Sequence, residues 1–250
     1  MKKTETYLSL CTQVYDLSKP TPPEDAYSFY RFYVLKAKGL ALEPMCGTGR
    51  FLLPLIEEGF DIHGFDVSEH MLEALHAKSK LKNLKPNVWK GFVEDLKKKE
   101  RYSLIFIPSG SFCLVIDPVA VKSVLKTFYD HLAEDGILLF EGETPKATPP
   151  LGVWRHSKWV RSDGKMIMLS QHTALEDEVY FSICKYELID NNNVIHREIE
   201  ELKVRLYESA GLIALLKEVG FSEVRIIKAF DRTRTPNKND ESIVYECRKS

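Results

Sequence analysis

The feature that most constrains this chain is a pair of closely spaced glycines, Gly47 and Gly49, between two apolar segments. Residues 40–45 are typical of a short buried strand, and residues 51–58 carry apolar positions at helical spacing. Two glycines in the turn between them let the backbone approach a ligand with no Cβ in the way. The next apolar run predicts a second strand, which ends at Asp66. This order predicts a β-α-β unit that holds an adenosine-type cofactor at the edge of a parallel sheet.

The glycine spacing separates the cofactor classes that use such a unit. A dinucleotide fingerprint needs a third glycine three residues after Gly49, where this chain has Leu52. A phosphate-binding P-loop ends in Gly-Lys-Ser/Thr, and that ending is absent. The pattern therefore disfavours a nicotinamide dehydrogenase and a nucleoside triphosphatase.

The remaining pattern runs from Glu43 through Cys46-Gly-Thr-Gly-Arg50 to Asp66-Val-Ser and Met71. It resembles the class I S-adenosylmethionine-dependent methyltransferases, over residues of about 35–143 and 208–248. The resemblance implies S-adenosyl-L-methionine as the cofactor and S-adenosyl-L-homocysteine as the product. The closest pattern is that of small-molecule members such as the glycine/sarcosine N-methyltransferases, which share a strand-rich insertion before the last helix.

The same resemblance implies roles for individual residues. Glu43 would organise the glycine turn, and Gly47 and Gly49 would face the methionine part of the cofactor. Asp66 would accept both ribose hydroxyls, which suits a carboxylate with two oxygens. The full set of implied cofactor residues is Tyr15, Tyr30, Glu43, Met45, Cys46, Gly47, Thr48, Gly49, Asp66, Val67, Met71, Phe92, Val93, Glu94, Pro108 and Ser109.

Three parts of this set leave alternatives open. Phe92 stands where relatives carry an acid, so either Phe92 packs on the adenine or the register slips and Glu94 or Asp95 contacts it. Tyr15 and Tyr30 would cover the sulfonium through cation–π contacts, unless these aromatic residues pack a helix on the sheet. Residues 107–112 lack the Asn-Pro-Pro-Tyr type of segment of DNA and protein amide methyltransferases and resemble that of small-molecule enzymes.

Strand and helix patterns alternate up to about residue 143 and resume at residue 208. They predict an α/β fold with a Rossmann-like, seven-stranded, mostly parallel sheet whose last strand is reversed. Residues 1–143 and 208–250 would form the cofactor-binding core with an N-terminal helical arm. A proline-rich break at 145–150 and helix-free strand patterns after it predict an antiparallel insertion over residues 144–207, on the substrate side.

Composition limits the partners of the chain. A net charge of −1 over 250 residues gives no basic face for nucleic acid. The five scattered cysteines lack metal-ligand spacing, so we expect reduced thiols and no metal site. No apolar leader or membrane-spanning stretch is visible, so we expect a cytoplasmic protein without a membrane partner. The expected partner is a small-molecule methyl acceptor, and a homodimer stays open.

The sequence specifies the substrate-binding residues less well than the cofactor-binding residues. Trp154, Arg155, Arg205 and Tyr207 are candidate substrate-binding residues in the insertion. His156, His172 and Glu176 are candidate bases, and the sequence does not identify a catalytic residue among them. The acceptor, and whether its N, O or C atom is methylated, also stay open. The alternative function is a module or partner subunit that binds the cofactor or its product without turnover.

Overall fold

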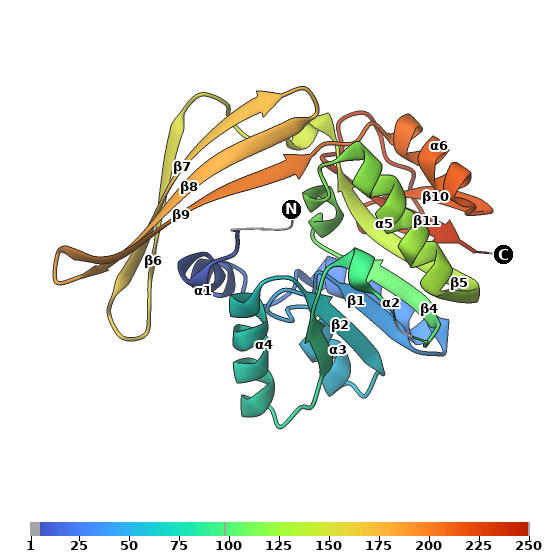
Figure 1. Cartoon of the computed structure of the whole chain (residues 1–250), viewed down its shortest axis with the longest axis horizontal. Helices are drawn as coiled ribbons and strands as arrows, with labels where there is room; N and C mark the ends of the chain where they lie inside the picture. Colours follow the sequence, from blue (N-terminus) through green and yellow to red (C-terminus); the bar gives the residue numbers. More distant parts are fainter. Residues whose placement is uncertain (1–5, 98, 250) are drawn as a thin grey trace.

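The computed structural model describes residues 6–97 and 99–249 and places them in two β-sheets with helices packed around the larger one (Figure 1). Sheet A has seven strands in the order β10-β11-β5-β4-β1-β2-β3. These strands are β1 (Ala41–Pro44), β2 (Ile62–Asp66), β3 (Asn87–Lys90), β4 (Tyr102–Ile107), β5 (Leu132–Glu143), β10 (Glu223–Lys228) and β11 (Ser242–Arg248). Sheet B has the order β6-β7-β8-β9, with β6 (Trp154–Val160), β7 (Met166–Glu176), β8 (Val179–Asp190) and β9 (Asn193–Arg205).

The strand directions in sheet A agree with the fold class that the sequence predicts. Each pair from β3 to β5 is parallel, while β11 runs antiparallel to both of its neighbours, β5 and β10. The α-helices are α1 (Ser9–Ser18), α2 (Glu24–Ala37), α3 (Leu52–Glu57), α4 (Glu69–Leu81), α5 (Pro118–His131) and α6 (Ser209–Val219). Short 3₁₀ turns are η1 (Val93–Asp95), η2 (Ser111–Leu114) and η3 (Pro145–Ala147). The prediction of a mostly parallel sheet with a reversed last strand is confirmed.

Alternate residues of the central strands face different helical layers. Leu42, Ile105 and Leu138 belong to the core cluster formed with α5 and α6. Their neighbours Ala41 and Leu104 belong to the cluster formed with α2 and α3 on the opposite face. Because both faces of the sheet are covered, these strands read as continuous apolar runs in the sequence.

Close packing of α3 on the sheet depends on a glycine in a strand. A Cβ added to Gly64 in β2 would lie 2.5 Å from Leu52 Cδ1. In the dinucleotide fingerprint, a glycine in the helix gives this close approach. Here the helix carries Leu52 and the strand carries Gly64. The missing side chain that allows helix and strand to pack closely is therefore on the strand.

The sequence signals for the starts of α4 and α5 are confirmed, and the signal for the end of α5 is wrong. The Ser68 hydroxyl accepts the amide of Met71 at the start of α4, and Asp117 caps α5 in the same way through Val119. Asp135 and Gly136 are typical helix-ending residues, which predicts that α5 stops there, but α5 ends at His131 and both residues lie within β5. The pairing of β4 with β5 shifts register there, and Asp135 has a positive φ of 60°.

Sheet B contains the predicted antiparallel strands and one further strand. The expected hairpin loop is present between β8 and β9, where Asn191 and Asn192 both have positive φ. The additional strand is β6, whose polar sequence gave no alternating pattern. One face of sheet B packs on α1, where Leu10 and Val14 form a small core with Ile167, Cys184 and Tyr186. Figure 1 shows α1 between sheet B and α4.

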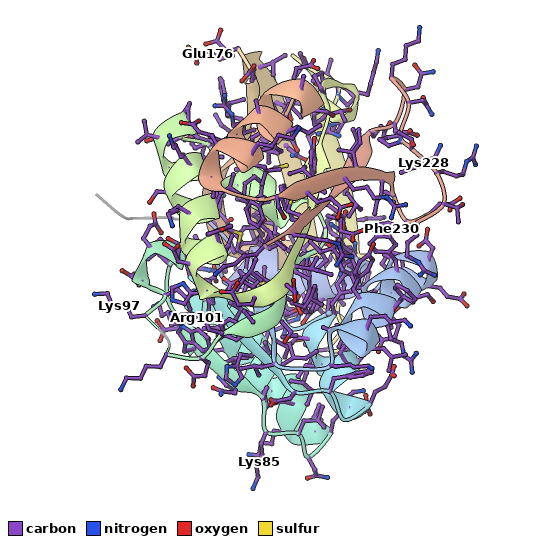
Figure 2. All side chains as sticks on the ribbon, turned by 90° about the vertical axis from the view of Figure 1, so that its right-hand side faces the viewer. Lys85, Lys97, Arg101, Glu176, Lys228 and Phe230 are labelled. Atoms are coloured by element: carbon purple, nitrogen blue, oxygen red, sulfur yellow. The ribbon has the colours of Figure 1, made fainter. Side chains whose placement is uncertain are left out.

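The turn between β7 and β8 lies beside the junction with the core, where the carbonyl of Glu178 accepts the amide of Leu206, and Figure 2 shows Glu176 at the opposite side of the molecule from Lys85. The two ends of the inserted segment meet at the core, where the amide of Tyr207 donates to the carbonyl of Glu143 at 2.8 Å. Within the described residues, no helix is both long and apolar enough to cross a membrane.

The contact of Gly64 with Leu52 gives a stability prediction. We expect Gly64→Ala to lower the free energy of unfolding by about 1–3 kcal/mol, because the added methyl group overfills the packed contact between α3 and β2. Urea unfolding followed by circular dichroism measures the change. The matched control is Gly211→Ala in α6, where a Cβ meets nothing within 4 Å. We expect this control to stabilise the helix by about 0.5–1 kcal/mol. Equal effects of the two variants would contradict the packing explanation.

Candidate active site

A cavity of about 470 Å³ opens at the carboxyl ends of β1, β2 and β4. Residues from α1 and the segment before it also line this cavity, as do residues 201–203 of the edge strand β9. The predicted cofactor residues that line it are Tyr15, Glu43, Met45, Cys46, Gly47, Asp66, Val67, Met71, Phe92, Val93, Glu94, Pro108 and Ser109. The sequence pattern therefore converges on one site from separate parts of the chain.

Asp66 fixes the shape of the glycine turn. Its Oδ2 accepts the amide of Gly47 and its Oδ1 accepts the amide of Ser68, both at 2.8 Å. Burial raises the pKa of Asp66, while these backbone hydrogen bonds oppose the rise. The prediction that Glu43 organises the turn is therefore corrected, because the side chain that accepts a hydrogen bond from the turn is that of Asp66.

Gly47 and Gly49 have different structural roles in the turn. A Cβ added to Gly47 would meet only Met71 Sδ, at 3.8 Å, so this glycine leaves open space at the cavity wall. A Cβ on Gly49 would lie 2.9 Å from Leu53 and 3.0 Å from Leu75. Gly49 does not line the cavity, and its predicted role beside the cofactor is corrected to one of packing beneath α3 and α4.

Glu43 belongs to a group of three buried carboxylates on one face of sheet A. Two of them are paired with tyrosines of α2, since the hydroxyl of Tyr30 donates to Glu141 and that of Tyr33 donates to Glu246, each at 2.7 Å. Glu43 is 2% exposed, and its Oε2 has no hydrogen-bond partner among the described residues. Burial raises the pKa of Glu43 well above its usual range, and the guanidinium of Arg50 opposes this rise.

Tyr30 is accordingly a correction to the predicted site. Its side chain is fully buried between α2 and the sheet, in contact with Phe51 and Phe106, and it does not line the cavity. The alternative, a helix that packs its aromatic residues on the sheet, applies to α2. Thr48 is also buried away from the cavity, and its hydroxyl donates to Asp16 of α1 at 2.6 Å.

Arg50 is the main residue that sequence reasoning missed. Its guanidinium lies over the rings of Tyr15 and Phe51, at 5.4 and 5.3 Å from their centroids. It also donates to the Ser109 hydroxyl, and its Nε is buried with no partner in the part of the chain that the structure describes. The available signal was its position directly after the glycine turn, at the start of an otherwise apolar helix.

Part of the cavity wall is mostly apolar. Phe92, Val93 and Glu94 line the cavity, as do Phe65 and residues 114–116. Asp95, one of the two acids left open for the adenine, is not among the lining residues. Thr6 and Tyr7 are further lining residues that the sequence pattern did not indicate.

The four predicted substrate residues of the insertion lie outside the cavity wall, which corrects their direct role. Trp154 is 56% exposed and packs its ring against His172, and Arg155 donates to Thr173 within sheet B. Arg205 and Tyr207 lie behind the wall, where they donate to the carbonyls of Ile116 and Val115, respectively. They support the lining segment 115–116 without reaching the cavity.

The candidate bases of the insertion do not line the cavity. His156 contacts the Ser170 hydroxyl at 3.0 Å, and His172 contacts the ring of Trp154. Glu176 is the last residue of β7 (Figure 2). None of the three is among the described residues that line either cavity, which corrects their predicted role.

A second cavity, of about 270 Å³, adjoins the first. Arg50, Phe51 and Ser109 line both cavities, so the two share a wall. The second cavity is also lined by Lys19, Pro23, Ala26, Gly110, Glu141, Glu143, Phe230 and Ser242. It combines two carboxylates, two cations and two hydroxyl groups with apolar walls, and the Ser242 hydroxyl is buried without a partner.

Residues 41–136 match a family model described as a methyltransferase domain. The chain is thus similar to methyltransferases over a segment that includes the glycine turn and Asp66. It is an enzyme, and its cofactor is S-adenosyl-L-methionine.

Similar proteins extend over nearly the whole chain. GWCH70_2453 of Geobacillus sp. (strain WCH70), a protein named as a methyltransferase, is 24% identical over 94% of this chain and 96% of its own. An S-adenosylmethionine-dependent methyltransferase from Clostridium acetobutylicum ATCC 824 superposes with a TM-score of 0.78 at 20% identity, over 95% of this chain and 97% of its own. The sugar N-methyltransferase KedS8 from Streptoalloteichus sp. ATCC 53650 superposes with a TM-score of 0.77 at 18% identity, over 100% of this chain and 98% of its own. At these identities, the two structures show a shared fold.

The buried carboxylate of Glu43 gives a prediction of how the free energy of unfolding depends on pH. Because burial raises the pKa of Glu43 in the folded chain above its unfolded value, ionisation favours the unfolded chain. The parent therefore loses stability as the pH rises from the unfolded value through the folded one. We expect Glu43→Gln to match the parent near about pH 4 and to exceed it at about pH 8, by on the order of 1–3 kcal/mol.

Urea unfolding of the cofactor-free protein at both pH values measures this difference. Glu246→Gln is the matched contrast, since Glu246 accepts hydrogen bonds from Tyr33 and Arg248. We expect that variant to be less stable than the parent at about pH 8. A Glu43→Gln variant that loses stability as Glu246→Gln does would show that Glu43 is not an unpaired charge.

Proposed function

We propose that this enzyme transfers the methyl group of S-adenosyl-L-methionine to a small-molecule acceptor bound in the second cavity. The observation that carries the proposal is the wall shared by the two cavities, at Arg50, Phe51 and Ser109. A donor in one cavity and an acceptor in the other would meet at this wall. Holding both reactants in line supplies most of the acceleration of such a displacement.

The chemistry of the larger cavity fits the cofactor. Asp66 keeps lone pairs on both oxygens after accepting the two backbone amides, so it can also accept the ribose hydroxyls. The unpaired Glu43 Oε2 suits the ammonium group of the methionine part. Arg50, with an unpaired Nε, suits its carboxylate, and the mostly apolar wall beside Phe92 suits the adenine. S-adenosyl-L-methionine, when bound, supplies a methyl group activated by a positive sulfur.

The size and lining of the second cavity support a small molecule as the acceptor. A volume of about 270 Å³ holds only a small ligand, and its charged lining favours a polar one. The segment after β4, with Pro108 and Ser109, lacks the Asn-Pro-Pro-Tyr pattern, which also counts against nucleic acid. The structural neighbour KedS8 is a sugar N-methyltransferase, which supports a small-molecule acceptor and the small-molecule branch of the family.

We also propose that residues 144–207 form a substrate-side unit and that residues 1–143 and 208–250 form the core with its arm. Two contacts support this division. Residues 201–203 of β9 line the cofactor cavity, and Tyr180 of β8 donates to Glu143 at the edge of the second cavity. The unit would thereby close both cavities on one side.

Methyl transfer and cofactor binding are measured separately to test the function. Calorimetry with S-adenosyl-L-homocysteine tests binding, and formation of this product from S-adenosyl-L-methionine with a panel of small amines, carboxylates and phenols tests turnover. We expect both to be positive. Tight binding without turnover of any acceptor would favour the alternative, a binding module or partner subunit.

Asp66 gives the sharpest variant for the cofactor site. We expect Asp66→Ala to weaken S-adenosyl-L-homocysteine binding sharply, because each ribose hydroxyl left unpaired costs on the order of 1–3 kcal/mol. The matched control is Asp61→Ala, at the exposed opposite end of β2. Calorimetry measures both affinities, and circular dichroism checks that both variants are folded. Parent-like affinity of a folded Asp66→Ala protein would rule out this placement of the ribose.

A further inference from the structure

The second cavity contains two carboxylates of β5 with different surroundings. Glu141 is occupied, since its Oε1 accepts hydrogen bonds from the Tyr30 hydroxyl and the Ser109 amide, both at 2.7 Å. Glu143, at the carboxyl end of the strand, accepts one long hydrogen bond, from the Tyr180 hydroxyl to Oε2 at 3.3 Å. Glu143 is therefore the less strongly hydrogen-bonded of the two carboxylates.

The other oxygen of Glu143 faces the loop that joins the two cavities. A Cβ added to Gly110 would lie 2.9 Å from Glu143 Oε1, so this oxygen lies against the residue that follows Ser109. Gly110 has a φ of +67°, a conformation that favours glycine. Among the described residues, no hydrogen bond to Oε1 is formed by a protein group. A ligand at the shared wall would therefore find a free carboxylate oxygen.

The charges around this carboxylate come from several elements. Burial raises the pKa of Glu143, and the hydrogen bond from Tyr180 and the positive charge of Lys19 oppose the rise. Burial and the charge of Arg50 in turn lower the pKa of Lys19. The groups that act on or contact Glu143 are Lys19 after α1, Tyr180 of β8, Cys113 of η2, Glu141 of β5 and Glu241 before β11. The result is a carboxylate that is a better proton acceptor than an exposed one.

We propose that Glu143 is a catalytic residue that binds the ammonium group of the acceptor and removes its proton, so that the acceptor is a small primary or secondary amine. This inference rests on the proposed function, since it assumes that the acceptor occupies the second cavity. The remainder of the cavity suits the organic part of such a molecule. Phe51, Pro23 and Phe230 supply apolar walls, and Figure 2 shows Phe230 in the loop after β10.

The proton and electron pairs balance in two steps. The ammonium gives one proton to the Glu143 carboxylate, which leaves a neutral amine with a free lone pair. That lone pair forms the new carbon–nitrogen bond while the bond from methyl carbon to sulfur breaks and its electron pair stays on sulfur. The positive charge moves from sulfur to nitrogen, and Glu143 then releases its proton to solvent.

The match of pKa values favours an amine over a hydroxyl acceptor. Lys19 and Arg50 lie at the same cavity, and like charge lowers the pKa of a bound ammonium group. A raised carboxylate pKa and a lowered ammonium pKa bring the two groups closer together, which makes proton transfer easier. An alcohol has a pKa too far above that of a carboxylate to be ionised by Glu143.

The test uses the full chain with S-adenosyl-L-methionine and paired probes. The amines are ethanolamine, glycine and glucosamine, and the matched hydroxyl compounds are ethylene glycol, glycolate and glucose. The variants are Glu143→Gln and Glu143→Asp, and Glu134→Gln at the exposed start of β5 is the control. Formation of S-adenosyl-L-homocysteine against pH gives the rates, and calorimetry with this product gives the cofactor affinity.

We expect the parent to methylate at least one amine and none of the hydroxyl compounds. Glu143→Gln should keep the cofactor affinity within about twofold and lose about 10²-fold or more in kcat, while Glu143→Asp recovers part of the rate. The parent rate should rise with pH only through the pKa of Glu143 and then level off. The residual rate of Glu143→Gln should rise about tenfold per pH unit up to the pKa of the amine, because only neutral amine reacts.

Different results would overturn the proposed function, the amine assignment and the role of Glu143. A parent that does not bind S-adenosyl-L-homocysteine would overturn the proposed function itself. A parent that binds it but methylates a hydroxyl compound, or no amine of the panel, would overturn the amine assignment. A folded Glu143→Gln variant with the parent's pH profile, or with a loss as small as that of Glu134→Gln, would overturn the role of Glu143 as the proton acceptor.

Discussion

The contact between the Asp66 carboxylate and two backbone amides is the interaction on which the rest of the site depends. It joins the end of β2 to the glycine turn after β1 through Gly47 and to the start of α4 through Ser68. Both amides are at the ends of elements, where the regular hydrogen-bond pattern leaves donors free. A single buried carboxylate thus fixes three elements around the cavity, and its remaining lone pairs are available there.

The buried carboxylates on the same face of sheet A show how the fold separates structure from ligand binding. Tyr30 and Tyr33 are three residues apart on α2, so their hydroxyls reach neighbouring strands and satisfy Glu141 and Glu246. Glu43 receives no such partner. A buried, unpaired carboxylate destabilises a protein unless a ligand compensates it, which fits a site that binds a cationic cofactor.

The arm and the insertion depend on each other. Glu200 of β9 accepts the amides of Tyr7 and Leu8 ahead of α1, and the helix then packs its apolar face on sheet B. Asp16 on the opposite side of α1 joins it to Thr48 and Lys78 of the core. The helix is therefore held between two units, and it places Tyr15 over the cofactor cavity.

The sequence by itself determined the fold class, the parallel sheet and the cofactor cavity, because these depend on local signals. The glycine turn, Asp66 and the alternating apolar runs are short-range patterns, and each has a backbone or burial requirement that few residue types meet. The hairpin at Asn191 and Asn192 could be predicted for the same reason. Strand β6 could not, since an exposed polar edge strand has no burial pattern.

Tertiary structure alone decided the functions of side chains that the motifs could not distinguish. Tyr15 and Tyr30 look alike in the sequence, but α1 places one at the cavity and α2 buries the other against Glu141. Glu143 could not be selected, because Lys19 and Tyr180 reach it from distant parts of the chain. Burial and the placement of charge depend on which elements meet, and only the folded chain brings these elements together.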